Sequence, residues 1–157
     1  MTMQLKKLTP NQAKNNLQQY CAYQERSHAE VKDKLYSFGL TTNEVEEIVS
    51  GLIADDYLNE ERFARAFARG KFRMKQWGRI KIKYELKRKR VSEYCIRKGL
   101  TEIDDLEYDK TLNKLFEEKW DALKREKNVF IKRKKLSDYL LQKGYERDLI
   151  NSLLKEA

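Results

Sequence analysis

The side chains of this sequence that could do chemistry are mostly basic, and they are concentrated in its middle. From residue 69 to residue 99 there are 13 Lys or Arg residues against 2 Glu. Helical spacing would put four of these cations on roughly one face: Arg79, Lys83, Lys87 and Arg90. A surface of this kind binds phosphates without reading sequence, or docks on an acidic protein groove. A second basic group follows at 124–135.

Catalytic groupings are missing from the sequence. His28 is the only histidine, and it falls in the first turn after a helix cap, where a surface or capping role is expected. The acid pairs 55–56 and 104–105 have no further ligand at a metal-binding spacing, so turn and helix-start roles are expected for both. No glycine-rich phosphate loop or nucleophile motif occurs. The sequence therefore predicts no enzyme, no metal and no cofactor.

Composition limits the class of protein. The 157 residues carry a net charge of +9, with 38% charged and 40% hydrophobic residues, which suits one domain over 1–157 or a short repeat array with an anionic partner. No apolar run approaches the ~18 residues of a membrane span, and segment 1–10 lacks the apolar core of a secretion signal. Cys21 and Cys95 read as free thiols. We expect a cytoplasmic monomer without membrane contact.

The elements that position the basic residues are predicted to be helices throughout. Helix-start signals occur at Thr9, Ser27, Thr41, Asn59, Ser92 and Asp104. Ser27 and Thr41 each have Glu three residues later, which is the capping-box pattern. Stop signals occur at Gly39 and Gly144, and Gly78 marks a break before the basic helix.

An internal repeat is visible in the apolar spacing. The pairs Val31/Leu35, Ile82/Leu86 and Leu136/Leu140 are each followed, five residues later, by Leu40, Val91 and Tyr145. This self-similarity predicts an all-α fold, an elongated, curved array of three tandem three-helix repeats. The repeats would span 9–56, 57–102 and 103–157. A compact bundle of eight or nine helices is the competing arrangement.

Aromatic residues accompany the basic segment. Trp77 and Tyr84 could stack on nucleic-acid bases, but core packing is the expectation we favour for both. Leu58 and Phe63 stand at the positions of a hydrophobic staple. The predicted structural motif comprises Leu58, Phe63, Phe67, Trp77, Gly78, Ile82 and Leu86.

These residues carry a resemblance to a known family. The stretch Tyr57–Ala64 with Phe67, then Trp77-Gly78 and Ile82 to Val91, resembles the signature of the RecX regulatory proteins. The upstream segment from Arg26 to Leu35 resembles the first-repeat motif of that family. Arg90 stands where the family usually has glycine, and a more open turn or a slightly longer helix is expected there.

The resemblance implies a modulator of the RecA recombinase. Such proteins bind RecA filaments on DNA, suppress ATP hydrolysis, strand exchange and LexA cleavage, and favour filament disassembly, which places them in DNA repair, recombination and the SOS response. RecA is the implied partner, and single- or double-stranded DNA could be bound directly or through RecA. The candidate contact residues are Arg79, Lys81, Lys83, Lys87, Arg88, Arg90, Lys132, Arg133 and Lys135. The alternative is a general nucleic-acid-binding protein of helix-turn-helix type.

Overall fold

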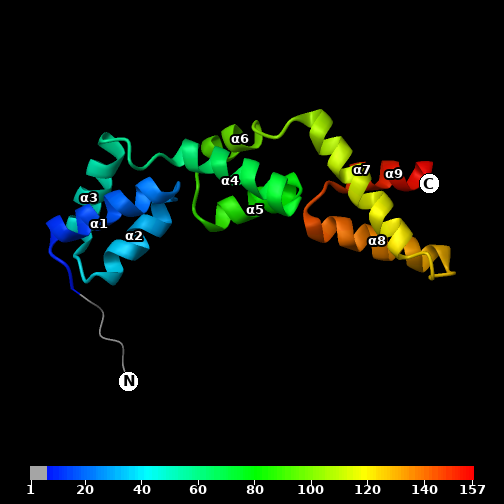
Figure 1. Cartoon of the computed structure of the whole chain (residues 1–157), viewed down its shortest axis with the longest axis horizontal. Coiled ribbons are helices and arrows are strands. Elements are labelled where there is room, and N and C mark those ends of the chain that lie inside the picture. The colour runs from blue at the N-terminus through cyan, green and yellow to red at the C-terminus, as the bar shows by residue number, and fades with distance from the viewer. Residues whose placement is uncertain (1–6) are drawn as a thin grey trace, which may run out of the picture. The chain divides into compact units, whose positions relative to one another are not determined.

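The computed structural model describes residues 7–157, and this part of the chain consists of nine helices without a strand (Figure 1). The helices are α1 (Pro10–Tyr23), α2 (His28–Ser37), α3 (Thr42–Ala54), α4 (Glu60–Lys75), α5 (Arg79–Arg88), α6 (Glu93–Leu100), α7 (Asp105–Ala122), α8 (Val129–Lys143) and α9 (Arg147–Glu156). The predicted all-α fold is confirmed. The expectation about segment 1–10 falls largely on residues 1–6, outside the described part.

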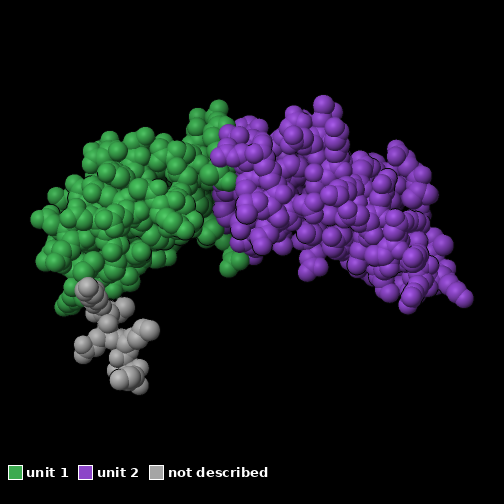
Figure 2. Space-filling model, viewed as in Figure 1, with its two compact units in different colours: residues 1–66, 86–99 green, residues 67–85, 100–157 purple. Residues whose placement is uncertain are grey.

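The helices group into two compact units, coloured separately in Figure 2. Unit 1 takes the chain up to Ala66 together with Leu86–Gly99, and unit 2 takes Phe67–Glu85 together with Leu100–Ala157. The division falls within α4 and within α5. The three repeat ranges proposed from the sequence are drawn differently and stay a prediction.

Side-chain caps form at all six predicted helix starts, but one predicted capping box is incomplete. Thr9 and Thr41 make complete capping boxes with Gln12 and Glu44. Asn59, Ser92 and Asp104 each accept a hydrogen bond from the backbone N–H three residues later. The box predicted at Ser27 is only half formed. Its hydroxyl accepts from the N–H of Glu30 at 3.1 Å, but the Glu30 carboxylate pairs with the Lys89 ammonium at 3.0 Å instead.

The core of unit 1 is built from the predicted apolar stripes of its helices. Its members are Ala13, Leu17, Cys21, Val31, Leu35, Leu40, Val45, Ile48, Val49, Leu52 and Leu58. Both cysteines of the chain are buried and free, as expected from the sequence. Burial raises the pKa of both thiols, which keeps them protonated and unreactive near neutral pH.

Unit 2 depends on a close backbone contact between the end of α8 and the start of α5. Gly78 donates its N–H to the carbonyl of Lys143 at 2.8 Å, and Ile80 donates to the carbonyl of Gly144 at 3.0 Å. A Cβ atom on Gly78 would stand 2.2 Å from that Gly144 oxygen. Only glycine fits this approach, so Gly78 does more than break the helix as predicted.

The three helices that contain the repeated apolar pairs, α2, α5 and α8, end in the same way. Gly39, Arg90 and Gly144 all have positive φ, at 81°, 61° and 100°. After α5, Val91 donates to the carbonyl of Leu86 at 3.2 Å, and after α8, Tyr145 donates to Leu140 at 3.1 Å. All three apolar residues that follow are buried: Leu40, Val91 and Tyr145. The spacing seen in the sequence therefore marks a recurring left-handed helix stop.

Arg90 corrects one expectation. The replacement of glycine gives neither an open turn nor a longer helix, because α5 ends at Arg88 and Arg90 itself takes the left-handed conformation. The hydrogen bonds to the preceding turn hold it there: its N–H donates to Lys87 at 2.9 Å, and Val91 closes the turn behind it. A non-glycine residue is strained in this region.

One further packing expectation was wrong. Tyr84 is 61% exposed and does not pack in a core, whereas Trp77 is half-buried. In α9, Ile150 is fully buried. Three other apolar residues of this helix are half-buried: Leu149, Leu153 and Leu154.

The strain at Arg90 predicts a difference between two substitutions. Arg90→Gly relieves the left-handed strain, whereas Arg90→Ala keeps it, and both remove the exposed pair with Asp33. We expect the glycine variant to be more stable than the alanine variant by ~1 kcal/mol, measured by urea unfolding. Gly144→Ala should act in the opposite sense and cost more, because its Cβ would stand 2.3 Å from that of Lys81. Equal stability of the two variants at position 90 would contradict the assigned strain.

Candidate functional site

The nine candidate cations divide between the two units. On α5, Arg79, Lys81 and Lys83 belong to unit 2. The α8 cations are also in unit 2: Lys132, Arg133 and Lys135. Unit 1 holds the remaining three: Lys87, Arg88 and Arg90. Their role in binding a partner stays a prediction, but their local contacts separate those that are engaged within the chain from those that face solvent.

Arg79 is tied into unit 2 through both its backbone and its side chain. Its N–H donates to the Tyr108 hydroxyl at 3.0 Å. Its guanidinium pairs with Asp105 at 2.6 Å and with Glu146 at 3.2 Å, and lies 3.8 Å from the centroid of the Tyr108 ring. Its side chain is only 28% exposed. These contacts make Arg79 an anchor for the start of α5, and they engage its side chain within the protein.

Tyr108 lies at the centre of this anchor. It is fully buried, and its hydroxyl donates to the Glu146 carboxylate while accepting from Arg79. Burial, and then the hydrogen bond to Glu146, raise the pKa of the phenol well above its ordinary value, because both favour the protonated form. The rings of Tyr108 and Tyr145 lie 5.1 Å apart, so the network sits against the aromatic core of unit 2.

Lys81 contributes to a cation–aromatic cluster in the same unit. Its ammonium lies 4.6 Å from the centroid of Trp77, and that of Lys71 lies 5.1 Å from the same ring. Phe67 meets Trp77 edge to face at 6.4 Å. Trp77 is thus held by packing and by two ammonium groups. The sequence did not predict the contact of Trp77 with Lys71, which lies on the preceding helix, α4.

Lys83 and Lys87 are the least engaged of the candidates. Both side chains are exposed on α5, one turn apart. Within the described part of the chain, neither ammonium has an ion-pair partner. Tyr84 beside Lys83 is 61% exposed, and Ile80 is 52% exposed. Exposed cations flanked by exposed apolar groups make these positions available to a partner.

Arg90, another candidate in unit 1, has a partner in α2. Arg90 lies 3.6 Å from Asp33 in a pair that is largely exposed. Its neighbour Lys89 makes the closer pair with Glu30 described above. Exposed pairs of this kind contribute little free energy, so Arg90 can exchange Asp33 for another anion. Arg88 is exposed at the end of α5.

The three α8 candidates are used locally. The Lys132 ammonium lies 3.8 Å from the centroid of Trp120. Arg133 donates a hydrogen bond to the Leu154 carbonyl in the last turn of α9, where carbonyl groups lack helical partners. Lys135 pairs with Glu126 at 3.3 Å. The α8 cations therefore support unit 2, and Lys132 and Arg133 are not fully exposed.

Acidic residues outside the basic segment neutralise part of it, which the sequence reading missed. Glu30 and Asp33 face Lys89 and Arg90, and Glu102 lies 3.4 Å from Arg69. The partners are separated by 33 residues or more, so no local count of charge could reveal them. The excess of cations counted along the segment overstates the field at its surface.

The side chains considered above for metal chemistry are His28 and the acid pairs 55–56 and 104–105. Across residues 7–157, no group of three or more His, Cys, Asp or Glu could hold a metal ion. His28 Nδ1 lies 3.4 Å from the Glu60 carboxylate, a local contact within unit 1. Asp56 takes positive φ in the turn after α3, and Asp104 caps α7, as predicted. In the same part of the chain, none of the helices combines the length and the apolarity needed to span a bilayer.

Comparison with known proteins agrees with this architecture. Residues 59–100 match the family "RecX, second three-helix domain", and residues 107–154 match "RecX, third three-helix domain". The crystal structure of RecX from Lactobacillus salivarius superposes with a TM-score of 0.83 at 25% identity, covering 94% of this chain and 95% of that one. A second RecX crystal structure, at 20% identity and the same TM-score, shares the fold.

The curated relatives point the same way. Regulatory protein RecX of Clostridium perfringens strain 13 is 34% identical over 131 residues, which is 83% of this chain and 61% of the relative. RecX of Bacillus cytotoxicus is 32% identical over 138 residues, and the match covers 50% of its length. The chain is thus an all-helical protein of tandem three-helix domains that presents basic side chains. It belongs to the RecX family.

The buried phenol predicts how stability depends on pH. Because the folded state raises the pKa of Tyr108, the contribution of this tyrosine is complete below its ordinary pKa of 10.0 and is lost as pH rises above it, where the unfolded chain ionises first. Tyr108→Phe should cost about 1 to 3 kcal/mol near neutral pH, since it removes one of the donors to the Glu146 carboxylate and the acceptor of the Arg79 N–H. The variant should also lose stability less steeply than the wild type above pH 10.

Urea midpoints at a neutral and an alkaline pH measure both effects. Tyr84→Phe, at an exposed tyrosine, is the matched control and should follow the wild type at both pH values. A Tyr108→Phe variant whose alkaline loss equals that of the Tyr84→Phe variant would contradict the assignment.

Proposed function

We propose that this protein is a regulator of the RecA recombinase that binds RecA–DNA filaments. In this proposal, binding lowers the ATPase, strand-exchange and LexA-coprotease activities of RecA and favours filament disassembly. Membership of the RecX family is the observation that carries the proposal. The chain spans 61% of one curated relative and 50% of another, so the partner and the activity are proposed for this chain rather than transferred with the family.

The proposed mechanism is binding without catalysis, in the cytoplasm, by a monomer. A RecA filament on DNA presents both acidic protein surface and phosphates, and exposed ammonium groups suit either. Lys83 and Lys87 are the side chains we assign to the first contact, because they are exposed and carry no ion pair within the described residues. Arg79 is assigned to positioning α5, because its contacts with Tyr108, Asp105 and Glu146 hold the start of that helix.

Charge reversal on α5 tests the proposal. Lys83→Glu with Lys87→Glu should weaken inhibition of RecA ATPase on single-stranded DNA at least about five-fold, because both attraction and steering are lost. Lys110→Glu with Lys155→Glu, two exposed lysines outside the candidate set, makes the same change in net charge and should inhibit like the wild type. Arg79 and Arg90 are left intact because each is engaged in ion pairs.

Two outcomes of the ATPase assay would count against the proposal. No inhibition by the unmodified protein would reject RecA regulation itself. Equal inhibition by both double variants, with helicity unchanged by circular dichroism, would keep the function but remove Lys83 and Lys87 from the contact.

A salt titration separates this function from general nucleic-acid binding. If the protein acts through RecA, its retention on single-stranded DNA should require RecA and nucleotide. If phosphate contacts alone hold it, it should bind bare DNA, with log K falling by about 0.7 per contacted phosphate for each unit of log salt concentration. We expect the first behaviour, and tight RecA-independent binding with a steep salt slope would favour the alternative.

A further inference from the structure

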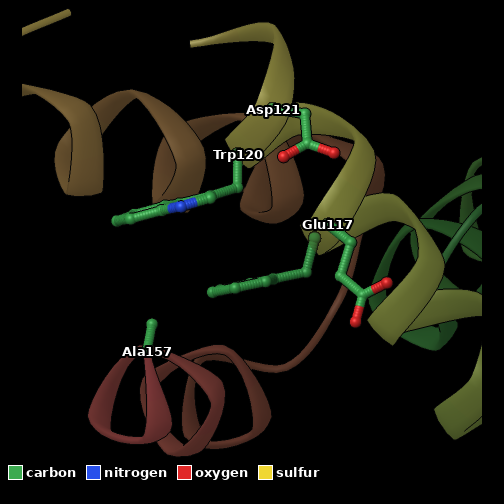
Figure 3. A pocket seen from close by; sticks show the side chains of 5 residues that line it. Glu117, Trp120, Asp121 and Ala157 are labelled. Atoms are coloured by element: carbon green, nitrogen blue, oxygen red, sulfur yellow. The ribbon is translucent and has the colours of Figure 1, made fainter. Parts of the chain in front are cut away.

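A small hollow at the end of unit 2 differs in character from the basic surfaces. It has a volume of about 290 Å³ and is lined by Phe116, Glu117, Trp120, Asp121 and Ala157 (Figure 3). Four of these residues come from the last two turns of α7, and Ala157 follows α9. The volume is at the small end for a ligand site, so a single side chain fits it better than a cofactor.

Two aromatic rings form one wall of the pocket. Phe116 and Trp120 are one helical turn apart, and their rings are nearly parallel, with 4° between the planes and 6.2 Å between centroids. Phe116 is 8% exposed, and Trp120 is half-buried. Figure 3 shows the indole of Trp120 extending from α7 above Ala157. A flat group entering the hollow therefore finds an aromatic surface to stack on.

Two carboxylates accompany the rings. Glu117 and Asp121 are also one turn apart, close enough for one ligand to reach both. Both are exposed, and within the described part of the chain neither has an ion-pair partner. Glu118 on the same helix differs, because it pairs with Lys114. In a protein with a net charge of +9, this unpaired acidic pair places local negative charge beside the stacked rings.

The chemistry of the pocket selects a planar cation. The Trp120 ring already takes one ammonium, that of Lys132 at 3.8 Å, which shows that its face suits a positive charge. A guanidinium group is flat, stacks on aromatic rings and donates paired hydrogen bonds to carboxylates. A nucleotide could stack in the same way, but its phosphate would meet the charges of Glu117 and Asp121. The pocket therefore favours a basic protein segment over nucleic acid.

We propose that the Phe116–Trp120 pocket is a docking site for an arginine side chain of a protein partner. The guanidinium stacks on the ring pair and donates to the carboxylates of Glu117 and Asp121. The site is formed by α7 and Ala157, and it uses neither Lys83 nor Lys87, the cations assigned to the first contact with the filament. It stands independently of the proposed function, and it gives the protein a contact with a basic surface in addition to its contacts with acidic ones.

Titration with N-acetylarginine amide tests the site directly. The two indole N–H signals in a ¹H–¹⁵N spectrum report on Trp77 and Trp120, and Trp120→Phe identifies the second. The arginine amide should shift the Trp120 signal saturably. N-acetylcitrulline amide, which has nearly the same shape without the charge, should not.

Charge-neutral variants provide the matched comparison. Glu117→Gln with Asp121→Asn should weaken the arginine titration about five-fold, the size expected from two exposed charged contacts. Glu118→Gln removes a charge from the same helix outside the pocket and should bind as the wild type does. The proposal would be overturned if the variant with Glu117→Gln and Asp121→Asn bound arginine as tightly as the wild type does. A citrulline shift as large as that of arginine would also overturn it. So would a larger response of Trp120 to a short oligothymidylate. None of these readouts involves RecA, so they fail or succeed separately from the proposed function.

Discussion

The end-to-start contact between α8 and α5 is the constraint on which the arrangement of unit 2 depends. Three successive N–H groups, those of Gly78, Arg79 and Ile80, donate to the Lys143 carbonyl, the Tyr108 hydroxyl and the Gly144 carbonyl. Helix starts and helix ends each leave backbone groups without partners, and here these groups are matched to each other. The favourable alignment of the two helix dipoles adds to the contact. The basic helix is thus held by its backbone, which leaves its side chains to other roles.

Local signals made much of this fold predictable. Caps such as Thr41 and Asp104 act within a single turn, and so a sequence window of a few residues contains their whole interaction. The stripe of Ile82 and Leu86 was predicted for the same reason, because helical periodicity alone decides which face is apolar. The repeat spacing proved informative beyond apolar burial, since it also marked the left-handed residue that ends each of the three helices.

Interactions between distant segments were not predictable in this way. Residues 69–99 have 13 cations against 2 Glu, which indicated a large uncompensated charge. In the structure, however, Lys89 pairs with Glu30, 59 residues away, and Arg79 pairs with Glu146, 67 residues away. Tyr84 failed as a core residue because α5 buries only the Ile82 side, and aromatic character alone does not say which face a residue occupies. The conformation of Arg90 was missed because a left-handed arginine contradicts local preference, and only the surrounding hydrogen bonds impose it.

The pattern of pairing changes what the net charge means for binding. Some positive charges are engaged at helix ends. Arg79 holds the start of α5 through Glu146, and Arg133 on α8 donates to a carbonyl in the last turn of α9. Within residues 7–157, the charge that reaches solvent unpaired is therefore only part of the total, and it includes the ammonium groups of Lys83 and Lys87 and the carboxylates of Glu117 and Asp121. Because screening removes long-range effects beyond about 10 Å at ordinary salt, a partner responds to these local groups rather than to the total. A protein of this composition can accordingly present an anion-binding helix and a cation-binding pocket at the same time.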